Sequence, residues 1–182
     1  FGSVASVLRE QLGGLDGRGS PLREGNFLSC QSAAPGRRRQ VPPRFVPDYG
    51  APLTLRVIED DLDSVLNSEQ HADFYRQSYR IDPQSDRMAA RLTGEPLIPK
   101  TGGMVSEGTS FGSIQLLPEG QPIILLKDRQ TLGGYPKLGT VFPLDAFALA
   151  QRQAPTQVHF SPMPLNEAQT QLRRFYRFFG VR

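Results

Sequence analysis

The chain has 182 residues, which is enough for one hydrophobic core or two small ones. Its 21 basic and 18 acidic residues leave a net charge of +3, which is a weak balance for a nucleic-acid-binding protein. No apolar run approaches the roughly 20 residues of a membrane helix, there is no signal-like N-terminus, and the single Cys30 cannot form an internal disulfide. We therefore expect a cytoplasmic protein that binds neither nucleic acid nor a membrane.

The first third of the chain carries few signals of regular structure. Apolar residues at helical spacing predict a helix over residues 3–11, which a glycine pair then ends. The glycine-rich stretch 15–30 is typical of irregular chain, with a short strand near Phe27 and Leu28. Residues 31–52 are rich in proline and predict an extended surface connector. The arginine run at 37–39 is interpreted as a solvated charge cluster rather than a nucleic-acid contact.

A strand and a short helix are expected next. Residues 53–58 alternate with β-branched side chains, which favours a strand. The aspartate cluster at 60–63 lacks the glycine and the spaced glutamate of an EF-hand loop, so it indicates a turn or a helix N-terminus. Asn67 is placed to cap a helix over 70–77. The two histidines are far apart in the chain, and no metal site is predicted.

A hairpin is predicted from strands at 79–81 and 87–92. Its bend contains Ser85-Asp86-Arg87-Met88. A guanidinium at this position matches two oxygens at once, so Arg87 could grip a carboxylate or a carbamate. Alternatively, Asp86 and a neighbouring arginine merely tie the bend together. Both interpretations remain open.

The long loop 94–112 contains the letters of a nucleophile motif. Gly108-Thr109-Ser110-Phe111-Gly112 fits G-x-S-x-G. A nucleophile elbow needs a preceding strand, a following helix and a histidine partner, whereas this run is predicted to lie between a loop and a strand. A serine-type amide hydrolase is therefore kept only as a second alternative.

The stretch after the next hairpin is the strongest candidate for a binding site. Strands at 114–117 and 122–126 flank a turn, and the second is a continuous apolar run typical of burial on both faces. A glycine pair and a proline then bend the chain sharply. Polar groups this dense on a loop that leaves a buried strand favour a binding site over a solvated hairpin. They are Asp128, Arg129, Gln130, Thr131, Tyr135 and Lys137, around Gly133 and Gly134.

The C-terminal third predicts a strand at 137–142, a helix at 144–151, a strand at 158–160 and a helix running from a cap at Asn166 to Phe178. The apolar stripe of that last helix is expected to pack against the domain or a partner. Many short strands, frequent Gly and Pro and only brief helices favour a mainly β domain that is closed or nearly closed. Periodicity by itself does not distinguish a barrel from a sandwich.

Several of these motifs together resemble the carboxyltransferase A/B family. The family includes the carboxyltransferase domain of urea carboxylase, proteins named allophanate hydrolase subunit 2, the C-type subunit of bacterial 5-oxoprolinase and KipA-type antagonists of a kinase inhibitor. The matching segments are Leu12 to Arg18, Ser85 to Met88, Arg91 to Gly94, Ser106 to Gly108, Gly112 to Gln115, Pro118 to Pro122 and Asp128 to Gly139.

The resemblance implies a cyclophilin-like β-barrel as the C-terminal lobe of a two-lobed protein. It also implies that the chain is the C-terminal portion of a longer protein and is inactive in isolation. Residues 1–30 would end the first lobe and form the junction, 31–52 the connector, 53–164 the barrel lobe and 165–182 a C-terminal helix.

The resemblance further implies chemistry on small amides, ureas or lactams. In the biotin-dependent branch, carboxybiotin carried by a partner protein donates its carboxyl group to an amide or urea nitrogen. Asp128, Tyr135 and Lys137 are then the expected catalytic residues: Asp128 handles a proton, Tyr135 donates to a carbonyl, and Lys137 stabilises negative charge. The expected substrate-binding residues are Arg87, Gln115, Arg129, Gln130, Gly133 and Gly134.

In the 5-oxoprolinase branch the same cleft would hold a cyclic amide during its ATP-dependent opening. The chain lacks the phosphate-loop motif G-x-x-x-x-G-K-[ST], so a companion subunit would use the ATP, and a third subunit could take part. The alternative from a different class is a KipA-type regulatory protein that binds a partner without turnover.

Overall fold

The computed structural model describes residues 10–32, 36, 40–60, 62–100 and 106–180. The chain divides into two units, Phe1–Val46 and Pro47–Arg182. This boundary falls inside the predicted connector. The expected helix at 3–11 and the arginine run at 37–39 lie outside the described residues, apart from Glu10 and Gln11, which form a turn.

The described part of the first unit is irregular. Its local order comes from short contacts, such as the bonds that the Arg18 and Ser20 N–H groups donate to the Asp16 carboxylate. The strand predicted near Phe27 and Leu28 is wrong. Both side chains are exposed, and no described segment pairs with them. A strand needs a partner for its backbone groups, so an apolar pair alone does not form one.

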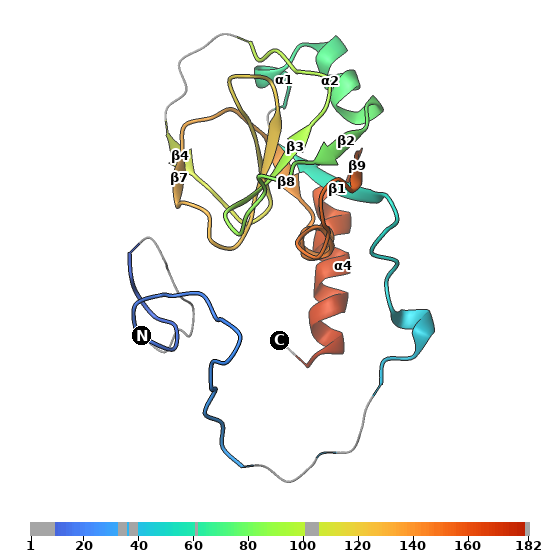
Figure 1. The fold of residues 1–182 in the computed structure, drawn as a ribbon. Helices are drawn as coiled ribbons and strands as arrows, with labels where there is room; N and C mark the ends of the chain where they lie inside the picture. The colour runs from blue at the N-terminus through green and yellow to red at the C-terminus, as the bar shows by residue number, and fades with distance from the viewer. Residues whose placement is uncertain (1–9, 33–35, 37–39, 61, 101–105, 181–182) are drawn as a thin grey trace. The chain divides into compact units, whose positions relative to one another are not determined.

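The second unit is built on a closed barrel with the strand order β1-β8-β5-β6-β3-β2-β9 (Figure 1). The parallel pairing of β1 with β9 completes the ring. A separate two-stranded sheet joins β4 to β7. The strands are β1 Leu53–Glu59, β2 Tyr79–Ile81, β3 Ala89–Thr93, β4 Glu107–Gly108, β5 Ser113–Leu116, β6 Pro122–Leu125, β7 Leu132–Gly133, β8 Lys137–Val141 and β9 Gln157–Pro162.

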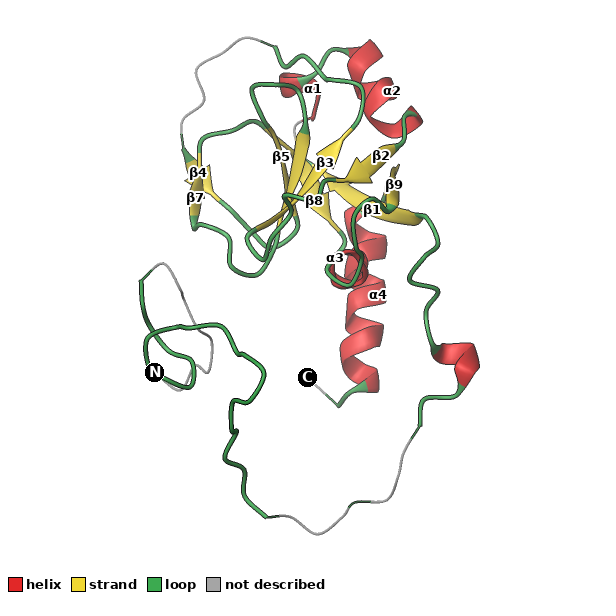
Figure 2. Cartoon of the chain, viewed as in Figure 1, coloured by secondary structure: helices red, strands yellow, loops and turns green. Residues whose placement is uncertain are grey.

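Four short α-helices and one 3-10 helix accompany the strands in the described residues. They are η1 Pro43–Phe45, α1 Leu62–Val65, α2 Ser68–Arg76, α3 Pro143–Leu149 and α4 Leu165–Phe178. The mainly β class with a closed barrel is therefore confirmed (Figure 2). None of the helices in the described residues has the length and apolarity to cross a membrane.

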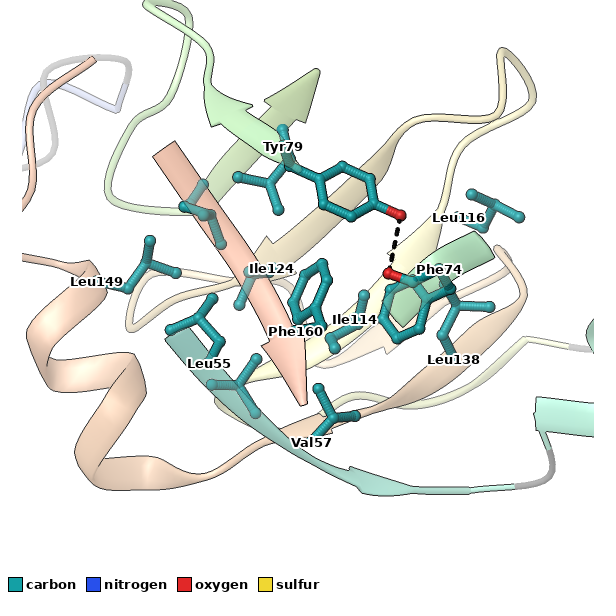
Figure 3. Close-up of a cluster of buried hydrophobic side chains, with 14 of the residues drawn as sticks. Leu55, Val57, Phe74, Tyr79, Ile114, Leu116, Ile124, Leu138, Leu149 and Phe160 are labelled. Atoms are coloured by element: carbon teal, nitrogen blue, oxygen red, sulfur yellow. Dashed lines mark hydrogen bonds between the residues drawn. The ribbon is translucent and has the colours of Figure 1, made fainter. Parts of the chain in front are cut away.

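The barrel interior is apolar and aromatic (Figure 3). Phe74 of α2 stacks on Phe160 of β9 with ring centroids 4.5 Å apart, and Tyr79 meets Phe160 edge-on at 5.2 Å. The buried Tyr79 hydroxyl donates to the Phe74 carbonyl at 3.4 Å, and burial raises the pKa of this phenol. Helix α2 thus packs an aromatic face against the barrel core.

The capping residue of α2 is correctly predicted from the sequence, because the Asn67 side chain accepts a bond from the Gln70 N–H at 2.8 Å. The cap predicted at Asn166 is wrong. Helix α4 already begins at Leu165, with Pro164 in the capping position and no side-chain cap bond. Pro164 has no N–H to leave unpaired and presets its own φ, so it begins a helix without a polar cap.

We expect Asn67→Ala to lower the free energy of unfolding by about 1 kcal/mol, because one N–H of the first turn of α2 loses its acceptor. Urea unfolding measures the change. Asn67→Ser is the matched control, since a serine hydroxyl can accept the same bond. Equal stability of the alanine and serine variants would contradict the assignment of the cap.

Candidate functional site

Strand β5 alternates between the interior and the exterior of the barrel. Ile114 and Leu116 belong to the interior core, so Gln115 between them points to the outer face. Its side chain is nevertheless only 1% exposed. The Gln115 Oε1 atom is buried and has no hydrogen-bond partner among the described residues. An unpaired buried acceptor costs free energy, and such atoms are unusual enough to mark a site.

The cover over Gln115 is the small β4–β7 sheet, which we call the flap. It consists of two residue pairs, Glu107 with Gly133 and Gly108 with Leu132. Gly133 is needed there because of close approach: a β-carbon at this position would lie 2.3 Å from Gln115 Nε2. The special backbone angle expected at Gly133 and Gly134 is not used, since neither has a positive φ.

Lys137 lies beside Gln115, because the two residues are register partners in the β5–β8 pairing. Its ammonium contacts the Asp60 carboxylate at 2.6 Å and the Glu107 carboxylate at 3.7 Å. The hydrogen bond to Asp60 raises the pKa of Lys137 above its ordinary value, so the side chain is a cation rather than a base at neutral pH. We call Gln115, Gly133 and Lys137 the outer-face site.

Asp60 and Glu107 are the functional neighbours that sequence reasoning misses. The sequence pattern assigns Asp60 only to a turn or helix start, and Glu107 only to a family motif. The acidic cluster after β1 is a usable signal, but it does not indicate which cation it meets. The partner depends on the barrel bringing the end of β1 beside β8.

The other residues of the predicted loop are arranged less closely. Tyr135 is 41% exposed, and its hydroxyl makes no hydrogen bond to the described residues. The Gln130 carbonyl accepts a bond from the Thr109 hydroxyl, which ties the loop to the segment that follows β4. Arg129 is half-buried and its Nε is unpaired among the described residues.

Arg87 and Asp128 lie elsewhere and bind each other. Arg87 Nε contacts Asp128 Oδ2 at 3.0 Å, and a second nitrogen contacts Oδ1 at 3.3 Å. The two-pronged grip predicted for a substrate carboxylate is therefore occupied by Asp128. Asp86 accepts bonds from the Met88 and Ala89 N–H groups, which supports the alternative in which this residue ties the bend.

The Arg87–Asp128 pair lines a cleft of about 470 Å³, whose wall includes Phe111 and Phe147 and which we call the end cleft. Neither Tyr135 nor Lys137 lines this cleft. The structure thus separates the three residues expected to be catalytic, with Asp128 at the end cleft and Lys137 at the outer-face site. A hollow of about 860 Å³ beside Tyr49 and Gln157 contains none of the predicted site residues.

We expect the Arg87–Asp128 pair to contribute less than about 1 kcal/mol to stability, because both side chains are substantially exposed and water screens the attraction. A double-mutant cycle of Arg87→Ala and Asp128→Ala, read by urea unfolding, measures the coupling. A coupling of about 3 kcal/mol, typical of a buried pair, would contradict the exposed geometry.

The G-x-S-x-G run does not form a nucleophile elbow. A turn and then β5 follow Ser110, where an elbow would have a helix. The Ser110 hydroxyl instead lies 2.9 Å from the Ser113 hydroxyl, and no described histidine bonds to it. The serine-hydrolase alternative is therefore wrong on geometry. Among the described residues, no cluster of three or more His, Cys, Asp or Glu side chains could hold a metal ion.

The closed barrel with its flap defines a mainly β protein of the carboxyltransferase type. The fold resembles the crystal structure of Kluyveromyces lactis urea carboxylase, with a TM-score of 0.74, 17% identity and coverage of 96% of this chain and 17% of that one. Residues 1–162 match the family described as carboxyltransferase domain, subdomain A and B. The chain belongs to this family.

Two curated relatives carry the same name, that of the C-type subunit of 5-oxoprolinase. The chain is 36% identical to the Haemophilus influenzae protein over 94% of its length, and 29% identical to the Escherichia coli protein over 98%. It spans 54% and 56% of the length of these two relatives. The predicted family resemblance is confirmed.

Proposed function

We propose that this chain belongs to a subunit of an ATP-dependent 5-oxoprolinase, which opens a small lactam together with companion subunits. The observation that carries the proposal is the similarity to two proteins named as 5-oxoprolinase subunits across nearly the whole chain. The geometry of the outer-face site supports it, because the groups gathered there match the groups of a lactam.

The Gln115 carboxamide has one acceptor and one pair of donors on adjacent atoms. A lactam presents N–H beside C=O, so the Gln115 side chain can accept from the ring nitrogen and donate to the ring oxygen. Its Oε1 atom has no partner among the described residues and is available for this bond. A site built to hydrogen-bond a substrate discriminates strongly against analogues that lack the matching group.

The Lys137 ammonium beside Gln115 supplies positive charge. It would attract an anionic lactam and stabilise negative charge that develops on the ring oxygen during opening. Gln115 is closed off by the flap, so the substrate would enter when the flap lifts. The flap is paired through only two residues of each strand, which makes lifting inexpensive.

ATP fits this chain poorly. The sequence has no phosphate-loop motif, and the Gly133-Gly134 pair leads into strand β8 rather than into a helix N-terminus that would hold phosphates. ATP would therefore be bound and used by a companion subunit.

Biotin-dependent carboxyl transfer is the second candidate, and the family's carboxyltransferase description favours it. When bound, carboxybiotin supplies an activated carboxyl group. The ureido ring of biotin also presents N–H beside C=O, so Gln115 would fit it by the same complementarity. In this candidate Lys137 would hold the negative charge of the carboxyl group.

The test is reconstitution of the full-length protein with its companion subunits. We expect ATP-dependent consumption of 5-oxoproline, insensitive to avidin. Consumption that avidin abolishes would favour the biotin-dependent candidate. A complex that forms but consumes no 5-oxoproline would overturn the proposal and favour binding without turnover, as in a KipA-type regulator.

A further inference from the structure

Helix α4 is attached to the barrel through its first half only. Ala168 and Leu172 pack against Phe142 and Met163, and Gln171 accepts a bond from Arg56 at 2.7 Å. Beyond this attachment the helix runs away from the barrel (Figure 2). Its C-terminal half is therefore held in a fixed direction but is not covered by the described part of the barrel unit.

The free half of α4 carries an aromatic cluster, which we call the aromatic tip and define as Phe175, Tyr176, Phe178 and Phe179. Phe178 is 83% exposed and Phe179 62% exposed. The rings contact one another, with centroids 5.0 Å apart for Phe175–Phe179 and for Phe178–Phe179. Exposed Phe residues in contact mark an interaction surface, whereas scattered single ones do not.

Arginines border the aromatic tip. Arg173, Arg174 and Arg177 are exposed, and their side chains form no ion pair or hydrogen bond with the described residues. Positive charge near a helix C-terminus favours the helix dipole, which accounts for part of their placement. The dipole does not account for the phenylalanine rings. Phe, Tyr and Arg together form the composition of protein–protein interface anchors.

The charge of the tip restricts its occupant. Residues 172–180 contain three arginines and no acidic residue, so a second copy meeting the same surface would bring like charges together. A helix lying on a membrane buries an apolar face along its length, whereas here only the last turns are free. Anchors at 175, 178 and 179 follow the i, i+3 and i+4 spacing by which a helix fills a groove.

We propose that the aromatic tip of α4 docks into an apolar groove with an acidic rim on a companion subunit of the complex. The identity of this partner rests on the proposed function. The tip lies beyond residue 162, where the family match ends, and away from the outer-face site, so it contributes to assembly rather than to the reaction. Its rings fill the groove, and its arginines meet the acidic rim.

The experiment titrates the full-length protein with its purified companion subunits and measures affinity by calorimetry. We expect the double variant Phe178→Ser, Phe179→Ser to bind about 30-fold more weakly, because truncating aromatic anchors removes most of an interface's energy. Arg173→Glu with Arg177→Glu should weaken binding about 10-fold and reduce its salt dependence. Leu165→Ser, which changes a 58% exposed residue at the other end of α4, is the matched control and should bind like the parent.

Parent-like affinity of both double variants overturns the inference, as does an equal loss in Leu165→Ser. Two further readouts identify other occupants, and either would overturn docking on a subunit. Self-association of the parent that the serine variant abolishes, with subunit affinity unchanged, would assign the tip to a second copy. Loss of binding to phosphatidylcholine–phosphatidylglycerol vesicles, with subunit affinity unchanged, would assign it to a membrane. Turnover at saturating subunit concentration is read separately: its absence in the parent refutes the proposed function, while the affinities still decide the role of the tip.

Discussion

Lys137→Ala is expected to lower 5-oxoproline turnover by the reconstituted complex about 100-fold, the loss typical of removing one preorganised charge-stabilising group. The Lys137 ammonium lies beside Gln115 and is held at 2.6 Å by Asp60, so its position is fixed before a substrate arrives. Steady-state kinetics with saturating ATP measures the change. The free energy of unfolding should change by less than about 1 kcal/mol, because Asp60 stays well exposed to water.

The matched control for this prediction is Arg76→Ala. Arg76 also forms a surface ion pair, with Asp73 at 3.2 Å, but it lies on α2 away from the outer-face site. This variant should keep parental turnover. Parental turnover in Lys137→Ala, or an equal loss in both variants, would remove Lys137 from the site.

Gln115→Met should reduce turnover by at least about 100-fold while leaving the protein as stable as before or more stable by about 1 kcal/mol. The reason is the unpaired Oε1 atom. The folded protein gains nothing from this buried acceptor, whereas a lactam N–H would bond to it. Methionine has a similar unbranched shape and fits under Gly133, so the flap keeps its place. Urea unfolding and steady-state kinetics measure the two effects.

Gln121→Met is the matched control, because the Gln121 amide is fully used. It accepts from the Gly94 N–H at 2.9 Å and donates to the Gly94 carbonyl at 3.0 Å. This variant should lose about 1–3 kcal/mol of stability, since two backbone groups lose their partners. If Gln115→Met proves equally destabilising, Gln115 holds the flap in place and does not await a substrate.

The strands of the barrel are predictable because their signals are local. The alternation at 53–58 and the continuous apolar run at 122–126 identify β1 and β6 directly. Closure of the sheet into a barrel is not predictable from periodicity. It depends on β1 pairing with β8 on one side and with β9 on the other, and these strands are far from β1 in the chain.

The candidate site is predictable only as a set of residues. The density of polar groups after β6 identifies Lys137 and Asp128, and the family motif identifies Gln115. Nothing in the sequence pattern separates these residues into an outer-face site and an end cleft. Nor does it indicate that Asp128 occupies the guanidinium of Arg87, because that contact joins segments 41 positions apart.

The sequence by itself determined the family, the mainly β class and most strands of this protein, since short runs of residues are enough to specify each. The tertiary structure decided which charges meet and which groups stay unpaired. Lys137 meets Asp60, and Gln115 is covered by Gly133, because barrel closure and strand register place them there. An ion pair and a buried acceptor are properties of distance in space, and distance in space is fixed only when the sheet has closed.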